Sequence, residues 1–417
     1  MATAPRKPTI RSRRIIERPR LIRALDRSSA PVRMLVGESG WGKTVLVEQW
    51  AGREGRTVGW FRARPSAADV AVTARALADA ADVVLDDAGR RLRQRLAVTS
   101  DPEQEATLLA EMLAEDLQDC PPEGWIVIDD YQHLAGAAAS ESFVETILSR
   151  SPIRLLVASE VRPSWAAPRR ILAGSVLEIP QAALAMTAEE VEAVLERARV
   201  DLTPGLVALA DGWPALVGLA AMVPDVGDVD AELPNTLYDF FADELYAGLE
   251  PGARAGLELL AAMPLVDREL AATLLGAERA NLVVDEAVEL GLLDERDGRL
   301  ELHPLFEAFV EKRALTESAV AATEAFPSAW AYYTARKETD AAFDLAHRLG
   351  VPTDIDRSLV ESIDDLLNGA RLSTLETWAS RATSLVGETP AVLVAQAEIA
   401  LRRGRHLTAQ ALADRAA

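Results

Sequence analysis

The sequence of 417 residues is poor in cysteine, histidine and aromatic side chains: it has one cysteine, Cys120, four histidines, and 5% Phe, Trp and Tyr. A single cysteine excludes an intramolecular disulfide and suits a reducing cytoplasm. The few Cys and His residues do not have the spacing of zinc ligands. No apolar run reaches about 18 residues, and the basic N-terminus has no apolar core behind it, so we expect neither a transmembrane helix nor a signal peptide. The length predicts two to four domains.

Positive charge is also scarce, because 44 Lys and Arg stand against 65 Asp and Glu, a net charge of −21. This balance disfavours unspecific nucleic-acid binding by the chain as a whole. The N-terminus is the exception: residues 1–33 hold ten Lys or Arg and two acids. We expect residues 1–16 to form a flexible basic arm that is disordered or packs on an acidic neighbour. Contact of Arg11, Arg13 and Arg14 with a phosphate backbone is the alternative.

The phosphate-binding pattern G-x-x-x-x-G-K-[ST] is matched by one stretch, Gly37-Glu38-Ser39-Gly40-Trp41-Gly42-Lys43-Thr44. Its glycines allow a tight turn whose N–H groups point at phosphate oxygens. Lys43 places a cation on the β- and γ-phosphates, and Thr44 offers a hydroxyl to Mg²⁺. An apolar run over residues 32–36 predicts a strand before the loop, and residues 45–50, from Val45 onward, predict a helix after it. Strand, loop and helix in this order indicate a nucleotide site.

A second apolar run, residues 125–128, ends in two acids. A buried strand of this kind delivers Asp129 towards the Mg²⁺ shell and places Asp130 to position a water for attack on the γ-phosphate. By itself this pattern is weak evidence for a nucleotide site, because a strand that simply ends in solvent is more common. Together with the P-loop upstream it is strong evidence. We expect this acidic strand and the P-loop strand to be neighbours in the sheet. We expect the end of a further strand, at Ser159, to lie beside the end of the acidic strand. Ser159 is then either a sensor of the γ-phosphate or a plain strand end.

Alternating strands and helices up to residue 181 predict a parallel, doubly wound sheet within a multidomain α/β and α chain. Thr187–Glu190 fits a capping box that opens a helix. Helices followed by a hairpin around Asp297-Gly298 predict a winged helix, and the alanine-rich helices beyond Ala314 predict an α-solenoid. The predicted domains are a basic arm (1–16), a P-loop NTPase domain (17–181), a helical lid (182–235), a winged-helix domain (236–315) and the TPR-like start of a helical-repeat sensor region (316–417). The last helix pair is open at Ala417, so we expect a longer natural protein.

The chain resembles the MalT-type, LuxR-family large ATP-binding transcriptional regulators, which belong to the STAND class of signal-transduction ATPases. The resemblance covers roughly residues 17–315 and depends on the order of its motifs. These are the P-loop, Ile126-Val127-Ile128-Asp129-Asp130-Tyr131, Leu177-Glu178-Ile179 with Met186-Thr187-Ala188-Glu189-Glu190, Gly212-Trp213-Pro214, and Leu302-His303-Pro304-Leu305-Phe306.

The resemblance implies further residues of the pocket. Pro214 is similar to a proline that packs on the adenine, although Trp213-Pro214 would also stop a helix. His303 is similar to a winged-helix histidine that contacts the β-phosphate of ADP, although it could be an ordinary hydrogen-bonded histidine. Arg18 is similar in position to an arginine that lines the pocket. The expected nucleotide-binding residues are Arg18, Gly37, Glu38, Ser39, Gly40, Trp41, Gly42, Lys43, Thr44, Val45, Ser159, Pro214 and His303. The expected catalytic residues are Lys43, Asp129 and Asp130, and the expected Mg²⁺ ligands are Thr44 and Asp129.

Two departures from the family pattern concern hydrolysis. The family commonly has an arginine directly after the serine that ends the fourth strand, whereas this chain has Glu160, and its nearest arginine is Arg162. The family also tends to carry acids after the second strand's tryptophan, where this chain has Arg62-Ala63-Arg64-Pro65. Both changes bear on γ-phosphate sensing and turnover, and neither touches the phosphate-binding loop.

The resemblance implies a switch that ADP with Mg²⁺ holds at rest and that ATP releases for self-association into a homo-oligomer, with slow hydrolysis. An unidentified inducer would act at the helical tail, and DNA would be bound only through a module outside this chain. Two alternatives remain: a P-loop ATPase with steady turnover that does not act in transcription, and a scaffold in which the nucleotide is structural.

Overall fold

The computed structural model describes residues 16–198, 211–221, 246, 249–289, 292–296, 298–302, 310, 319–350 and 352–417. The chain divides into two compact units, which are described separately. The sheet unit contains residues 19–38, 43–183 and 350–417; the hairpin unit contains the described parts of 1–18, 39–42 and 184–349. The proposed basic arm lies outside the described residues except for Ile16.

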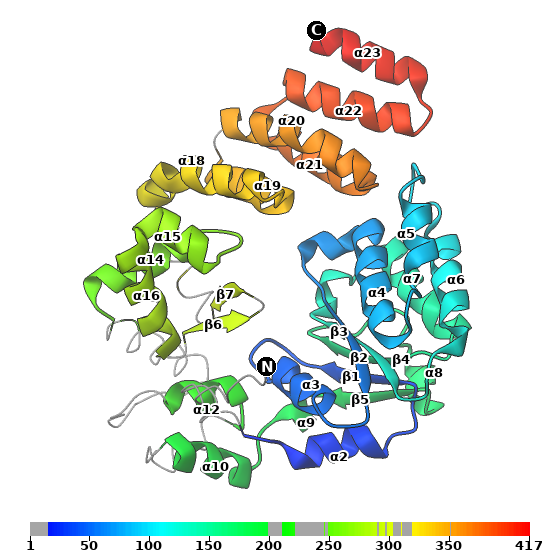
Figure 1. Ribbon diagram of the computed structural model, residues 1–417, viewed down its shortest axis with the longest axis vertical. Coiled ribbons are helices and arrows are strands. Elements are labelled where there is room, and N and C mark those ends of the chain that lie inside the picture. Colours follow the sequence, from blue (N-terminus) through cyan, green and yellow to red (C-terminus); the bar gives the residue numbers. More distant parts are fainter. Residues whose placement is uncertain are drawn as a thin grey trace. The chain divides into compact units, whose positions relative to one another are not determined.

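A parallel sheet forms the centre of the sheet unit, with its five strands in the order β2-β3-β4-β1-β5 (Figure 1). The strands are β1 (Val32–Val36), β2 (Thr57–Arg62), β3 (Gly124–Asp129), β4 (Arg154–Ser159) and β5 (Val176–Pro180). Almost every residue of β1, β3 and β4 is buried, because helices cover both faces of the sheet. This is why these strands are mostly apolar in the sequence, and the prediction of a parallel, doubly wound sheet is confirmed.

The prediction that the P-loop strand and the acidic strand are neighbours is wrong, because β4 lies between them. β4 pairs in parallel with β1, where Val36 is opposite Ser159, and with β3, where Val127 is opposite Leu156. Residues 155–158 of β4 are at most 2% exposed, which suits a central strand with neighbours on both sides. The sequence spacing indicates how many strands there are, but their lateral order depends on how each crossover helix packs.

The NTPase domain also contains helices before, between and after the strands. These are α2 (Pro19–Arg27), α3 (Lys43–Ala51), α4 (Val70–Val84), α5 (Arg90–Leu96), α6 (Ala106–Asp116), α7 (Ala138–Arg150), α8 (Pro168–Leu172) and α9 (Gln181–Leu184), with short 3-10 turns η1 (Pro65–Ala68), η2 (Leu117–Asp119) and η3 (Tyr131–His133). Helices α4, α6 and α7 share one core cluster with the strands. Gly59 of β2 has a packing role there, since a Cβ on it would lie 1.9 Å from the carbonyl oxygen of Ala80 in α4.

The helical tail of the sheet unit is fastened to the NTPase domain through Asp69. The tail helices are α20 (Pro352–Asn368), α21 (Leu372–Val386), α22 (Pro390–Arg402) and α23 (His406–Ala416), joined by short turns (Figure 1). Asp69 is 6% exposed, and its Oδ1 accepts a hydrogen bond from the N–H of Ala71, which caps α4. Its Oδ2 accepts from the Ser373 hydroxyl (3.0 Å), the Thr374 hydroxyl (2.6 Å) and the Thr374 N–H (3.3 Å) at the start of α21. One carboxylate therefore caps two helices, and Ala370 of the tail packs in the NTPase core cluster.

The hairpin unit is mostly helical. Its elements are α10 (Ala188–Ala198), α12 (Pro214–Ala220), α14 (Pro251–Ala261), α15 (Arg268–Leu275), α16 (Ala277–Glu289), the antiparallel strands β6 (Leu293–Arg296) and β7 (Arg299–Leu302), α18 (Ala319–Ala335) and α19 (Thr339–Leu349). The hairpin predicted around Asp297-Gly298 is present, with Gly298 at φ +76°. Three helices and a hairpin follow the order of a winged helix, while the boundaries of this domain and of the helical lid stay predictions.

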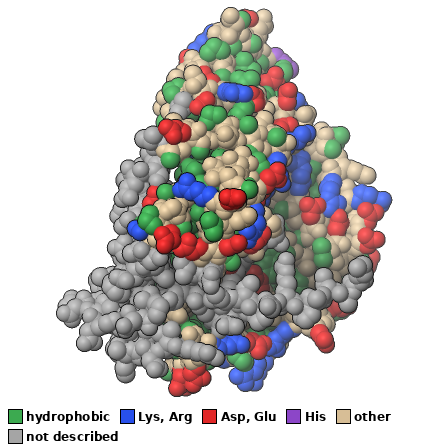
Figure 2. Space-filling model, turned by 60° about the vertical axis from the view of Figure 1, so that its left-hand side comes forward, with side chains coloured by type: hydrophobic (Ala, Val, Ile, Leu, Met, Phe, Trp, Pro, Cys, Tyr) green, Lys and Arg blue, Asp and Glu red, His purple; other side chains and the backbone are tan. Residues whose placement is uncertain are grey.

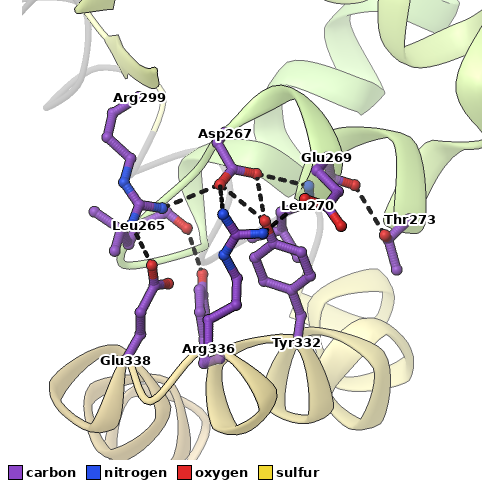
Figure 3. Close-up of polar contacts among 10 residues, drawn as sticks. Leu265, Asp267, Glu269, Leu270, Thr273, Arg299, Tyr332, Arg336 and Glu338 are labelled. Carbon is purple, nitrogen blue, oxygen red and sulfur yellow. Dashed lines mark hydrogen bonds and ion pairs between the residues drawn. The ribbon is translucent and has the colours of Figure 1, made fainter. Parts of the chain in front are cut away.

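A second buried aspartate, Asp267, joins α15 to α18 within the hairpin unit (Figure 3). Its Oδ1 accepts from the N–H of Leu270 (2.8 Å), and both of its oxygens accept from the Tyr332 hydroxyl (2.8 Å each). Arg299 of the hairpin donates to Asp267 (3.2 Å) and also pairs with Glu338. Burial raises the pKa of Tyr332 above its ordinary value, so the hydroxyl remains a donor. These contacts hold the first helix of the predicted tail firmly against α15.

Among the described residues, none of the helices combines the length and the apolar character that crossing a membrane would require.

Candidate nucleotide site

The P-loop leaves β1 and ends at the first residue of α3, as the sequence predicts. Gly37 N–H donates to the carbonyl of Ser159 (3.1 Å), which ties the start of the loop to the end of β4. Gly40 and Gly42 have φ values of +79° and +73°, in the left-handed region that glycine adopts at little cost. Because α3 begins at Lys43, the free N–H groups of its first turn face the loop, as in a phosphate site.

Lys43 is buried at 7% exposure inside the loop. Its Nζ donates to the carbonyl oxygens of Gly37 (2.7 Å) and Glu38 (2.8 Å). Burial lowers the pKa of Lys43, while the carboxylates of Glu160, Asp130, Asp129 and Glu38 act against this shift. A cation in a concave backbone loop with surplus negative charge nearby can exchange its carbonyl partners for phosphate oxygens.

Asp129 is fully buried at the end of β3 and is joined to the P-loop helix by Thr44. The Thr44 hydroxyl donates to its Oδ1 (3.1 Å), which also accepts from the N–H of Asp130 (3.2 Å). Its Oδ2 is buried without a hydrogen-bond partner within the described parts of the chain. Burial, followed by the charge of Asp130, raises the pKa of Asp129 to about 6. An orphaned carboxylate oxygen beside a hydroxyl fits a hard cation.

A cation at Thr44 and Asp129 would need oxygens from elsewhere. Within the described residues, there is no group of three or more His, Cys, Asp or Glu side chains that could hold a metal. Mg²⁺ commonly binds one or two protein oxygens and takes its remaining ligands from water and from the phosphates of a nucleotide. The donor set therefore fits a metal that arrives with a nucleotide.

Asp130 is held by two residues that the sequence did not mark as site residues. Its Oδ2 accepts from Arg62 Nε (3.1 Å) at the end of β2, and its Oδ1 accepts from Gln132 Nε2 (3.2 Å). Gln132 also accepts from the N–H of Glu160 (3.2 Å), so it links the ends of β3 and β4. Arg62 lies opposite Asp129 in the β2–β3 register, a position that only the strand pairing reveals. Asp130 itself has φ +56°, an uncommon conformation for a non-glycine residue.

Replacing Asp129 with Asn should stabilise the free protein above pH 7. The pKa of a free aspartate is 3.8 and that of Asp129 in the fold is about 6, so the folded state binds the proton more tightly. Ionised Asp129 therefore costs stability at pH 7.5, and this cost disappears as the pH falls from about 6 to about 4. We expect Asp129→Asn to raise the free energy of unfolding by roughly 2 kcal/mol at pH 7.5 and by much less at pH 4. Chemical denaturation at both pH values measures this.

The control is Asp86→Asn, which removes an exposed carboxylate of the same domain and should show no such pH dependence. A loss of stability in Asp129→Asn at pH 7.5 would contradict the argument that burial dominates at this carboxylate.

The apex of the P-loop packs inside the hairpin unit against the turn around Pro214. The N–H of Ala215 donates to the carbonyl of Gly40 (3.1 Å), and the rings of Trp41 and Trp213 stack with centroids 6.5 Å apart. A Cβ on Gly42 would lie 3.9 Å from the Cβ of Pro214 and 3.7 Å from Nη1 of Arg18. Within the hairpin unit, Pro214 and Arg18, both singled out by the resemblance, therefore lie beside residues 39–42 of the loop.

Arg18 is buried and fixed by the start of the lid. It donates to the carbonyls of Leu184 and Ala185 (3.0 Å for the latter) and through Nε to Glu190 (3.3 Å). Glu190 accepts from the N–H of Thr187 (3.2 Å), and the Thr187 hydroxyl accepts from the N–H of Glu190 (3.3 Å), so the predicted capping box is confirmed. The capping carboxylate therefore also positions Arg18, a double role that the motif alone does not reveal.

The remaining predicted residues have simpler surroundings. Ser159 is fully buried, and its hydroxyl accepts from the N–H of Val161 (3.3 Å), which is what a strand end also shows. The N–H of Glu38 donates to the side chain of Gln181 (2.8 Å), a contact that the sequence did not signal. Ser39 and Val45 are partly buried on the loop and the first turn of α3, and His303 lies outside the described residues.

Arg162, the arginine nearest to the family's sensing position, is engaged elsewhere. Its guanidinium makes a two-point contact with Glu178 of β5, at 2.8 and 2.7 Å. Glu160 is exposed at the position where the family has arginine.

Comparison with known proteins agrees with this geometry. Residues 26–160 match the family model of the AAA domain. The chain is similar to a crystal structure of a Signal Transduction ATPase with Numerous Domains (STAND) protein with a tetratricopeptide repeat sensor from Pyrococcus horikoshii, with a TM-score of 0.72 and 16% identity. The similarity covers 99% of this chain and 60% of that one.

A weaker similarity links 73% of this chain to 99% of a Walker-type ATPase of Pyrococcus abyssi, with a TM-score of 0.35 and 13% identity. No curated protein matches the sequence. The chain spans three-fifths of the length of the Pyrococcus horikoshii structure. The match to the AAA domain shows an AAA-type P-loop NTPase domain, which implies nucleotide binding. The fold over nearly the whole chain is that of a STAND ATPase, a parallel P-loop sheet followed in the sequence by a long helical C-terminal region.

Proposed function

We propose that this chain is the nucleotide switch of a STAND-type regulator, at rest with ADP and released for self-association by ATP. The observation that carries the proposal is the anchoring of α21 on the NTPase domain through Asp69. Because Asp69 of the P-loop domain binds the N-terminus of the tail helix α21, a conformational change in that domain can alter the position of the tail.

The residues of the site take separate roles in this proposal. Lys43 gives up its loop carbonyls for the phosphate oxygens, with the loop N–H groups around it. Thr44 and Asp129 hold Mg²⁺, which neutralises phosphate charge when bound. Asp130 positions the attacking water, and its contacts with Arg62 and Gln132 keep its orientation fixed in the resting protein. Pro214 and Arg18 line the nucleotide beside the loop, with His303 as the predicted contact of the β-phosphate.

The regulatory part of the proposal follows the MalT-type resemblance. An inducer binds the helical tail, the cytoplasmic protein forms homo-oligomers in its ATP state, and transcription is the output. The described part of the hairpin unit is a poor candidate for DNA binding. Its helix α16 carries Glu278, Asp285 and Glu286 on partly or fully exposed positions, which gives the surface the wrong sign for phosphates.

Nucleotide titration of the purified protein tests this function. We expect ADP and ATP to raise the unfolding temperature, by an amount equivalent to about 2.7 kcal/mol at a hundredfold excess over the dissociation constant. The turnover number for ATP hydrolysis should stay far below roughly 1 s⁻¹, the lower end of the range for ordinary enzymes. ATP should also increase the molecular mass of the protein measured by analytical ultracentrifugation. Steady turnover by a monomer would instead indicate a catalytic NTPase, and ADP that neither exchanges nor hydrolyses would indicate a scaffold.

A further inference from the structure

We propose that Glu160 makes this site prefer a nucleoside diphosphate over a nucleoside triphosphate. The inference rests on the proposed nucleotide site and adds which phosphate chain it accepts. Glu160 stands where the family that the chain resembles commonly has an arginine, so the preference would be specific to this chain.

The strand order places Glu160 between the two halves of the site. β4 lies between β1 and β3, and the carboxyl ends of all three strands meet at one edge of the sheet. Ser159, the last residue of β4, accepts from the N–H of Gly37 at the start of the P-loop. The next residue, Glu160, donates its own N–H to Gln132, whose amide also binds Asp130. The backbone of Glu160 is therefore fixed between the phosphate loop and the acid that faces the γ-phosphate in the proposed function.

The charges around this edge are mostly negative. The carboxylates near buried Lys43 are those of Glu160, Asp130, Asp129 and Glu38. The guanidinium groups close by are committed: Arg62 is paired with Asp130, and Arg162 makes its two-point contact with Glu178. Glu160 itself shares no ion pair that the structure shows in the described residues, and its side chain is exposed.

A diphosphate and a triphosphate differ in the charge they bring to this edge. The α- and β-phosphates lie on the N–H groups of the loop in a P-loop site, whereas the γ-phosphate extends towards the acidic strand. The γ-phosphate thus adds negative charge on the side where Glu160 and Asp130 stand. Like charges at the same partly exposed edge repel, and salt weakens the repulsion. We expect the dissociation constant of ADP to be about tenfold lower than that of ATP, and we expect this difference to depend on Glu160.

The test measures the dissociation constants of ADP and ATP on the full chain by displacement of a fluorescent nucleotide, with and without Mg²⁺. Glu160→Gln keeps the size of the side chain and removes its charge, so the ratio of the ATP constant to the ADP constant should fall about tenfold, mostly through ATP. Glu160→Arg should reverse the preference. The matched control is Glu123→Gln, which removes an exposed carboxylate next to the opposite, amino end of β3 and should leave the ratio unchanged.

An unchanged ratio in Glu160→Gln, or an equal change in Glu123→Gln, overturns the inference while leaving the proposed function intact. Failure of the wild-type protein to bind either nucleotide removes the proposed function, and this inference with it. Equal unfolding temperatures of the variants without nucleotide show that a changed ratio does not come from damage to the fold.

Discussion

Lys43→Ala should weaken the binding of both ADP and ATP at least a hundredfold, to the point where neither stabilises the protein. Lys43 is the buried cation inside the loop, and four carboxylates act on it. Without the ammonium, those carboxylates face the phosphates with nothing to compensate them, and the carbonyls of Gly37 and Glu38 lose their donor. Isothermal titration calorimetry with each nucleotide measures the loss directly.

The stability of the free variant separates this effect from misfolding. Burial lowers the pKa of Lys43, so the charged side chain is costly in the fold, and Ala should not lower the unfolding temperature of the nucleotide-free protein by much. Lys43→Arg retains the charge in a planar, forked group and should recover only part of the affinity. Wild-type affinity in Lys43→Ala would refute the assignment of residues 37–44 as the phosphate loop.

Asp69→Ala should strongly lower the stability of the protein. It removes the cap of α4 and the cap of α21 at once, and it leaves the buried N–H of Ala71 and the part-buried donors of Thr374 without this acceptor. Each cap contributes about 1 kcal/mol and each orphaned donor adds to that, so we expect a loss of roughly 3 kcal/mol. Differential scanning calorimetry measures the loss, and hydrogen exchange should show faster exchange in the first turns of both helices.

The paired variant Ser373→Ala with Thr374→Val isolates the tail side of this contact. It preserves Asp69 and the bond to Ala71, so α4 should keep its protection while α21 loses part of its own. Under the proposed function, both variants should also exchange bound ADP faster than the wild type. If the first turn of α21 stayed as protected in Asp69→Ala as in the wild type, the Asp69 contact would have no part in holding the tail.

The parts of the site that the sequence predicted are those in which the chemistry lies within a few consecutive residues. The P-loop, the acidic strand end and the capping box at Thr187 each need one short segment with fixed spacing, so their geometry follows locally. The hairpin turn at Gly298 is of the same kind, because a two-residue turn requires a residue with positive φ.

The parts that the sequence did not predict depend on segments that meet only in the fold. The pairing of Arg62 with Asp130 requires β2 to lie beside β3, and the contact of Gln181 with Glu38 requires the end of β5 to lie near the P-loop. The position of β4 between the two functional strands had to be seen as well. The sequence placed the end of β4 beside the acidic strand, which is confirmed, but it did not place β4 between that strand and the P-loop strand.

Helix α18 contains a proline in its interior. Proline favours the first turn of a helix and is costly further along it. In the structure, α18 starts at Ala319 and contains Pro327 within it. Proline removes one backbone hydrogen bond there, a loss that the packing of the following turns against α15 can offset, since Tyr332 and Tyr333 both bond to residues 265–267.

The Asp267 cluster sets a limit on how sensor modules can be exchanged between proteins by recombination. A junction placed directly behind the hairpin would keep Arg299 and Leu270 but discard Tyr332, so the buried carboxylate would meet a foreign surface without its hydroxyl donor. A junction behind Leu349 keeps α18 and α19 in the same protein as Asp267. Helices α18 and α19 therefore belong with the hairpin in any exchange. A chimera joined behind Leu349 should fold, whereas one joined at residue 315 should not.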